Sequence, residues 1–186
     1  MPGMSAAASI QVGVVVAREG LDSKWEDYVW RPVGVVHGEP ELEPWQEMRR
    51  GDGWVHFYAG THTINLFRKE TDEYKFNLEG REPVIYVVLS QPDDYEEEDE
   101  DAICPYAVHL VTASPYEAAD YLDSSDQIIE PVPMPQSVIA LIAEFIGEHH
   151  VEQQFKKRQR DEVKLEEHKF GQEPLVELRK RMRQEN

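Results

Sequence analysis

The chain of 186 residues contains 37 acidic and 19 basic residues, which gives a formal net charge of −18 at pH 7. This acidic balance disfavours nucleic acid and anionic membranes as partners, because neutralisation of phosphate groups supplies most of the affinity for them. The single cysteine excludes an intramolecular disulfide, and the apolar runs are too short to span a bilayer. A cytoplasmic protein is therefore expected.

Alternating apolar residues predict the first strands of the chain. A strand over 9–17 is apolar at every second position, on one face: Ile10, Val12, Val14 and Val16. A second strand is predicted over 28–36, where Pro32 indicates a sheet edge or a bulge. The glycine- and proline-rich residues 37–53 predict a loop.

The next segment predicts a β-hairpin followed by a short helix. Strand patterns cover Trp54–Tyr58 and Thr63–Arg68, and residues 59–62 form a suitable turn between them. A helix is predicted over 71–80, because Thr71 is a suitable N-cap and acidic residues follow it in the first turn.

Two apolar runs predict neighbouring strands, 83–90 in the centre of a sheet and 106–113 beside it. The residues between these runs are strongly acidic, since eight of the nine residues 93–101 are aspartate or glutamate. Dense like charge favours a solvated conformation, so 91–103 is interpreted as a flexible acidic loop.

Ser114, Pro115 and Glu117 match a capping box with proline at the first helical position. In this motif the Ser114 hydroxyl accepts a hydrogen bond from the Glu117 amide, and the Glu117 carboxylate accepts one from the Ser114 amide. The alternative is a nucleophilic serine, for which the only base nearby in sequence is His109, so the cap is favoured. The apolar face of this helix is predicted to carry three side chains: Tyr116, Ala119 and Leu122.

The rest of the chain predicts an extended segment over 127–135, a helix over 135–150 and a charged tail. The apolar stripe of the helix has four members: Val138, Leu141, Ile142 and Phe145. Six or seven strands with two or three helices predict a single globular α+β domain over 1–150, built on an antiparallel sheet or a small β-barrel. Residues 151–186 are predicted to be partly helical or disordered, and carry a net charge of +2 against −20 for 1–150.

The sequence assigns no catalytic, metal-binding or cofactor-binding residue, and no cofactor is expected. The glycine-rich phosphate loops and the G-x-S-x-G motif are absent from it. Its seven histidines and one cysteine lack the spacings that are typical of metal sites.

Two sets of residues are candidates for binding a partner. The basic cluster of the tail is the first set: Phe155, Lys156, Lys157, Arg158 and Arg160. This cluster could dock on an acidic partner or on RNA, and it could equally be solvated or folded back onto the chain's own acidic body. An aromatic sheet face is the second set: Trp25, Tyr28, Trp30, Trp54 and Tyr58. Core packing competes with docking as the role of these rings.

Five stretches carry a resemblance to a known family: VGVVVAREGLDSKWEDYVWRPVGV, GDGWVHFYAGTHTINLFRKETDEYKFNL, PVIYVVL, YAVHLVTASPYEAADYLDS and VPMPQSVIALIAEFIGEHHVEQQFKKRQRD. Over most of residues 12–161 the chain resembles an uncharacterised domain of unknown function that is found mainly in proteobacteria. Members similar to this chain tend to be encoded beside formate dehydrogenase and its accessory genes. Some of them carry the name molybdopterin-guanine dinucleotide biosynthesis protein A.

The resemblance implies a non-catalytic accessory protein in the maturation or assembly of a molybdenum-dependent formate dehydrogenase. The expected partner is a protein, either formate dehydrogenase or one of its maturation factors. One alternative is an enzyme or carrier that acts on molybdopterin guanine dinucleotide. A second alternative is a nucleic-acid-binding regulator that uses the basic tail, although the acidic body makes nucleic acid an unfavourable partner.

Overall fold

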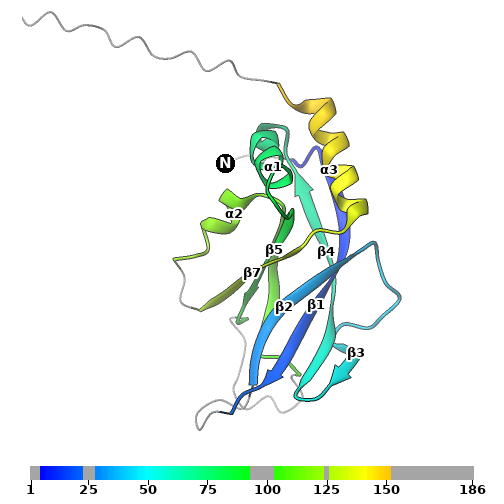
Figure 1. Ribbon diagram of the computed structural model, residues 1–186, viewed down its shortest axis with the longest axis vertical. Coiled ribbons are helices and arrows are strands. Elements are labelled where there is room, and N and C mark those ends of the chain that lie inside the picture. Colours follow the sequence, from blue (N-terminus) through cyan, green and yellow to red (C-terminus); the bar gives the residue numbers. More distant parts are fainter. Residues whose placement is uncertain (1–4, 23–27, 93–102, 124–125, 152–186) are drawn as a thin grey trace, which may run out of the picture. The chain divides into compact units, whose positions relative to one another are not determined.

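The computed structural model describes residues 5–22, 28–92, 103–123 and 126–151 (Figure 1). Within these ranges the chain forms seven strands: β1 (Ala8–Gly20), β2 (Tyr28–His37), β3 (Gln46–Gly51), β4 (Trp54–Leu66), β5 (Val84–Ser90), β6 (Ala107–Thr112) and β7 (Gln127–Pro133). The same ranges contain a 3-10 helix and three α-helices: η1 (Arg68–Glu70), α1 (Thr71–Leu78), α2 (Pro115–Ala119) and α3 (Gln136–His149). The basic cluster 155–160 and the acidic residues 93–101 lie outside the described residues.

The strands form two antiparallel sheets, which confirms the predicted α+β class. The first sheet has the strand order β2-β1-β4-β3 and the second the order β6-β5-β7, so the described ranges contain no closed barrel. The two sheets meet where β2 contacts β7 and where β4 contacts β6. The three helices gather towards one end of the sheets (Figure 1).

The apolar core lies between the two sheets. The predicted apolar face of β1 is confirmed, because Val12, Val14 and Val16 are completely buried. The predicted central strand is also confirmed: β5 lies between β6 and β7, and its Val87 and Leu89 are completely buried. Burial of each such side chain contributes about 1.5–3 kcal/mol relative to leaving it exposed.

The predicted hairpin at residues 59–62 is wrong, because β4 is one continuous strand that contains a bulge. Gly60 has a φ of 100°, and the pairing between β1 and β4 shifts register opposite Val14. An extra residue in a strand reverses which alternate positions face the core. Phe57 before the bulge and Ile64 after it are therefore both buried. In a regular strand these two residues would face opposite sides, because the difference between their positions is odd.

The predicted loop over 37–53 is also wrong in part, because its end forms the edge strand β3. All six residues of β3 are exposed, so the segment has no apolar alternation that would indicate a strand. Pairing with β4 holds β3 in place, and Met48 is the extra residue at a register shift in this pairing.

Each outer strand of the two sheets carries a feature that hinders the addition of a further strand. Pro32 lies in β2 beside a register shift, which confirms the predicted edge or bulge. Met48 in β3 and His109 in β6 are bulged residues, and β7 contains Pro131 and Pro133. Because bulges and prolines interrupt the ladder of backbone donors, these edges are poor templates for strand pairing.

Two predictions about the helices need correction. Thr71 is the first residue of α1 and not its N-cap, because η1 immediately precedes the helix and the Thr71 hydroxyl donates to the Arg68 carbonyl at 3.3 Å. Leu141 of α3 is 38% exposed and lies outside the core, whereas Val138, Ile142 and Phe145 are buried as predicted. No helix of the described residues is long and apolar enough to cross a membrane.

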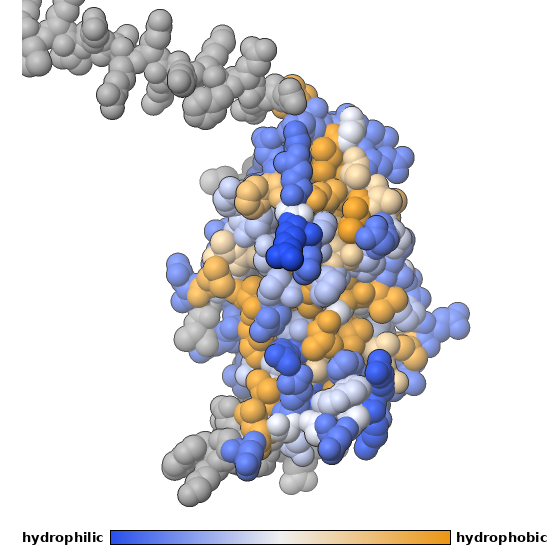
Figure 2. All heavy atoms as spheres, viewed as in Figure 1, coloured by the Kyte–Doolittle hydropathy of each residue, from blue (hydrophilic) through white to orange (hydrophobic). Residues whose placement is uncertain are grey.

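The face of the molecule that carries β1 and β2 does not present a uniform surface. In the view of Figure 2, apolar side chains are interspersed with hydrophilic ones over this face. Single apolar side chains at a protein surface are common and indicate no binding site.

Candidate functional site

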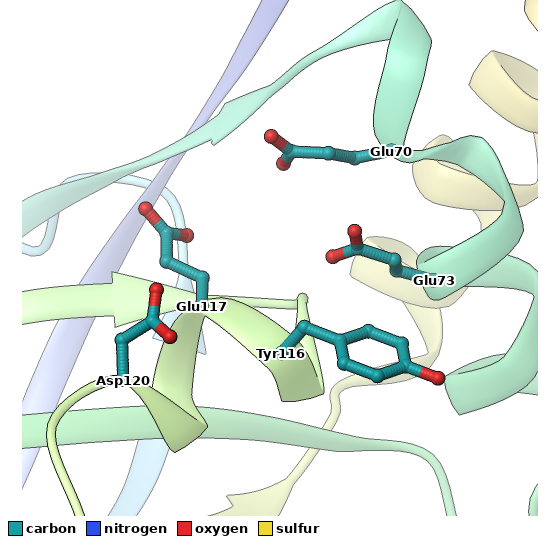
Figure 3. Close-up of a pocket in the computed structure, with 5 residues that line it drawn as sticks. All are labelled: Glu70, Glu73, Tyr116, Glu117 and Asp120. Carbon is teal, nitrogen blue, oxygen red and sulfur yellow. The ribbon is translucent and has the colours of Figure 1, made fainter.

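An open hollow of about 310 Å³ lies between α1 and α2, and its lining is strongly acidic (Figure 3). Five residues line it: Glu70, Glu73, Tyr116, Glu117 and Asp120. We call this feature the acidic hollow. Glu70 ends η1, Glu73 lies on the first turn of α1, and the other three residues come from α2 and its C-cap.

The start of α2 forms one wall of the acidic hollow and follows from the predicted cap. The Ser114 hydroxyl accepts a hydrogen bond from the Glu117 amide at 3.0 Å, with Pro115 at the start of the helix, as predicted. The second half of the predicted capping box is wrong, because the Ser114 amide donates to the Thr112 hydroxyl at 3.0 Å. Thr112 satisfies the amide locally, and the Glu117 carboxylate lines the hollow.

The prediction that Tyr116, Ala119 and Leu122 form an apolar face of α2 is also wrong. Tyr116 and Leu122 are 63% and 68% exposed, and Ala119 is exposed as well. The buried residue is Ala118. The helix ends at Ala119 after little more than one turn, so the helical spacing used for the prediction does not extend to Leu122.

Ser114 also connects α2 to α1. Its hydroxyl donates to the Glu73 carboxylate across a sequence separation of 41 residues. The side chain is completely buried, so this serine is inaccessible to a substrate in the folded state. His109, which precedes Ser114 by five residues in the sequence, packs against the Tyr121 ring with the centroids 5.3 Å apart. Ser114 therefore holds two helices together.

Glu70 is held in place by the buried Tyr74 of α1. The Tyr74 hydroxyl donates to Glu70 Oε2 at 2.9 Å and accepts from the Phe67 amide at 3.1 Å. Burial raises the pKa of Tyr74 well above its ordinary value, so the group remains a phenol that donates to the carboxylate. The Glu70 carboxylate consequently has a defined position at the rim of the hollow.

Asn77 joins α1 to the second sheet with three hydrogen bonds. Its amide nitrogen donates to the Val84 and Ala113 carbonyls, both at 2.8 Å, and its carbonyl accepts from the Val84 amide at 3.1 Å. These bonds satisfy backbone groups at the start of β5 and directly after the end of β6. They also fix α1, which carries Glu73, against the strands that lead to α2.

The carboxylates of the acidic hollow influence one another. The pKa of Glu70 is raised, first because burial disfavours its charged form, and also because Glu73 and Glu117 repel a further negative charge. The hydrogen bond from Tyr74 and the ammonium group of Lys69, 3.8 Å away, act in the opposite direction. A positive group that entered the hollow would relieve this repulsion.

The end of α3 lies beside the start of α1. His150 Nδ1 is 3.2 Å from the Thr71 hydroxyl and 3.7 Å from an Asp72 carboxylate oxygen. The neighbouring His149 packs its ring against Phe145, with the centroids 4.6 Å apart. Among the described residues, no group of three or more histidine, cysteine or acidic side chains is arranged to hold a metal ion.

The chain matches, over residues 11–159, the model of a family described as "Protein of unknown function (DUF3305)". The chain belongs to this family. The matched residues contain every described strand and helix from β2 to α3, most of β1, and all five lining residues of the acidic hollow. No curated protein and no solved structure matches the chain.

The aromatic residues that the sequence predicts as candidates for docking differ in their exposure. Trp30 and Tyr58 are 8% and 2% exposed and belong to the packed interior, whereas Tyr28 is 51% exposed. Trp54 is half-buried and packs against the His56 ring, with the centroids 4.4 Å apart. Trp25 and the basic cluster lie outside the described residues.

Sequence reasoning missed the acidic hollow as a site. The sequence patterns assign Glu73 and Glu117 only to helix starts, and they assign no role to Glu70 or Asp120. The lining comes from segments more than 40 residues apart, which only the contact between α1 and α2 brings together. The available signal was the acidic residue in the first turn of each helix, and such residues are common at helix N-termini without any other role.

Proposed function

We propose that the protein is a non-catalytic accessory protein that binds a partner protein in the maturation or assembly of a molybdenum-dependent formate dehydrogenase. The partner is formate dehydrogenase itself or one of its maturation factors. The biological setting comes from the resemblance of the sequence to the family encoded beside formate dehydrogenase genes. The observation that carries the binding role is the acidic hollow between α1 and α2.

The hydrogen bonds around the acidic hollow support binding better than catalysis. Tyr74 holds Glu70, and the buried Ser114 holds Glu73, so two of the four carboxylates have fixed positions. A group held in place before binding loses little conformational freedom when a partner docks. An acidic surface also increases the rate of association with a positively charged partner.

Affinity purification of the tagged full-length protein from its native host tests this function. We expect mass spectrometry to identify formate dehydrogenase subunits or their maturation factors among the recovered proteins. Deletion of the gene is expected to lower formate dehydrogenase activity. If no such protein is enriched and the activity of the deletion strain is unchanged, the proposed function is wrong.

A pair of charge variants locates the binding to the acidic hollow. The double variant Glu117→Gln and Asp120→Asn removes two negative charges from the lining and should reduce recovery of the partner. The matched control, Glu39→Gln with Glu41→Gln, removes two charges at exposed positions between β2 and β3 and should leave this recovery unchanged. Recovery of a pterin or guanine nucleotide with the purified protein would instead favour action on molybdopterin guanine dinucleotide.

A further inference from the structure

Two large aromatic side chains are exposed beside the acidic hollow. Phe76 of α1 is 66% exposed, and Tyr116 of α2 is 63% exposed. Phe76 follows Glu73 by three residues, so the two side chains occupy neighbouring positions on the surface of α1. Tyr116 lines the hollow, and Figure 3 shows its ring extending below Glu73 towards α1. The exposed side of α1 and α2 thus combines aromatic and acidic groups.

The charge around these rings defines the kind of partner that fits them. None of the five residues that line the hollow is basic. Within the described residues, the one ion pair that Glu70 forms is with Lys69. Nucleic acid would be repelled by the four carboxylates. A segment with positive charge alone would leave both rings in water, and a purely apolar segment would leave the carboxylates unpaired and partly desolvated.

We propose that this surface docks an arginine-containing amphipathic segment of a partner protein. We call the surface the acidic–aromatic face, and it consists of six residues: Glu70, Glu73, Phe76, Tyr116, Glu117 and Asp120. An arginine of the segment enters the acidic hollow, and an apolar side chain of the same segment packs on Phe76. The inference rests on the proposed partner-binding function and adds the chemistry of the partner to it.

Arginine fits the acidic–aromatic face better than lysine for a geometric reason. Its planar guanidinium can donate two parallel hydrogen bonds to one carboxylate and can stack on an aromatic ring at the same time. Arg18 already shows the second kind of contact in this protein, with its guanidinium carbon 4.6 Å from the centre of the Tyr28 ring. Tyr116 offers an exposed ring in the wall of a hollow lined by carboxylates, so both contacts are available there.

Selection of a random dodecapeptide library on the full-length protein tests the proposal. We expect the selected peptides to be enriched in arginine together with leucine or an aromatic residue. Their affinity is expected to fall by about fivefold or more in Phe76→Ser and in Glu117→Gln. Replacement of the arginine by lysine should weaken the peptide, and replacement by glutamate should abolish binding.

Matched variants control for nonspecific effects of each substitution. Met48→Ser changes an apolar residue of β3 that is 41% exposed, and Glu41→Gln removes an exposed charge elsewhere; neither should alter the affinity. Phe76 and Glu117 are not part of the core, and circular dichroism should show that their variants remain folded. No enrichment, or selected peptides that bind Phe76→Ser and Glu117→Gln as well as the unmodified protein, would overturn the inference.

The two proposals fail in distinguishable ways. If formate dehydrogenase proteins co-purify equally with the unmodified protein and with Phe76→Ser, the partner uses another surface and only this inference is wrong. If arginine-containing peptides bind the acidic–aromatic face while no formate dehydrogenase protein co-purifies and activity is unchanged, the docking chemistry stands and the proposed function is wrong.

Discussion

The Ser114 hydroxyl accepts a hydrogen bond from the Glu117 amide on α2 and donates one to the Glu73 carboxylate on α1. One buried side chain therefore caps a helix and joins that helix to another. Because Glu73 and Glu117 both line the acidic hollow, the shape of the hollow depends on a residue that does not line it.

Replacement of Ser114 by alanine should destabilise the protein by about 1–3 kcal/mol. The variant loses the acceptor for the Glu117 amide and the donor to the Glu73 carboxylate. The free energy of unfolding, measured by urea titration, should fall accordingly. The control Ser137→Ala changes an exposed serine of α3 and should leave this free energy nearly unchanged. Equal effects of the two variants would show that the connection between the helices contributes nothing.

Replacement of Asn77 by alanine should be more costly, at about 3 kcal/mol, because it leaves three backbone groups of two strand ends without partners. Hydrogen exchange should increase first at the Val84 amide, which loses its acceptor. The exposed Asn65 of β4 provides a control of the same residue type, and Asn65→Ala should change stability little. Retained protection of the Val84 amide in the Asn77 variant would contradict the assignment.

The raised pKa of Glu70 predicts a dependence of stability on pH. A carboxyl group whose pKa is higher in the folded state favours folding below its ordinary pKa of 4.5, and this contribution is lost as the pH rises through the raised value. In Glu70→Gln the contribution is absent, whereas the amide oxygen can still accept from Tyr74. The variant should therefore gain stability relative to the unmodified protein as the pH increases from 4 to 7.

Urea unfolding at several pH values measures this difference for Glu70→Gln, with Glu39→Gln as the exposed control. The difference should be near zero below the ordinary carboxyl pKa and should grow through the range in which Glu70 ionises. A constant difference across this range would show that the burial of Glu70 and its repulsion by Glu73 and Glu117 do not affect folding.

Gly60 is predicted to be essential for the geometry of β4. Its φ of 100° is strained for any residue with a side chain, so Gly60→Ala should cost about 1–3 kcal/mol. Gly34→Ala is a suitable control in β2, because an added Cβ there meets no atom within 4 Å. Thermal unfolding of the two variants compares them directly, and similar midpoints would mean that the bulge tolerates a side chain.

Local patterns predict most of the strands, because alternating or continuous apolar residues reflect burial on one or both faces of a strand. The apolar residues of β1 alternate as a half-buried strand requires, whereas β5 was predicted from a continuous apolar run, of which Val87, Val88 and Leu89 are all completely buried. The same reasoning failed for β3, where no residue is buried and pairing with β4 supplies the structure. The same reasoning predicts a turn at Gly60, where the structure has a bulge. A bulge and a chain reversal both interrupt the alternation of apolar and polar residues, so the sequence pattern does not distinguish them.

The sequence by itself determined the class of the fold, the apolar faces of its central strands and the cap at Ser114, because each depends on residues within one or two turns or on a repeated spacing. Only the tertiary structure decided that Glu70 and Glu73 share a hollow with Glu117 and Asp120. These carboxylates meet because hydrogen bonds of the buried residues Ser114 and Asn77 fix α1 against distant segments. Such bonds join polar residues far apart in the chain, and no periodic pattern marks them.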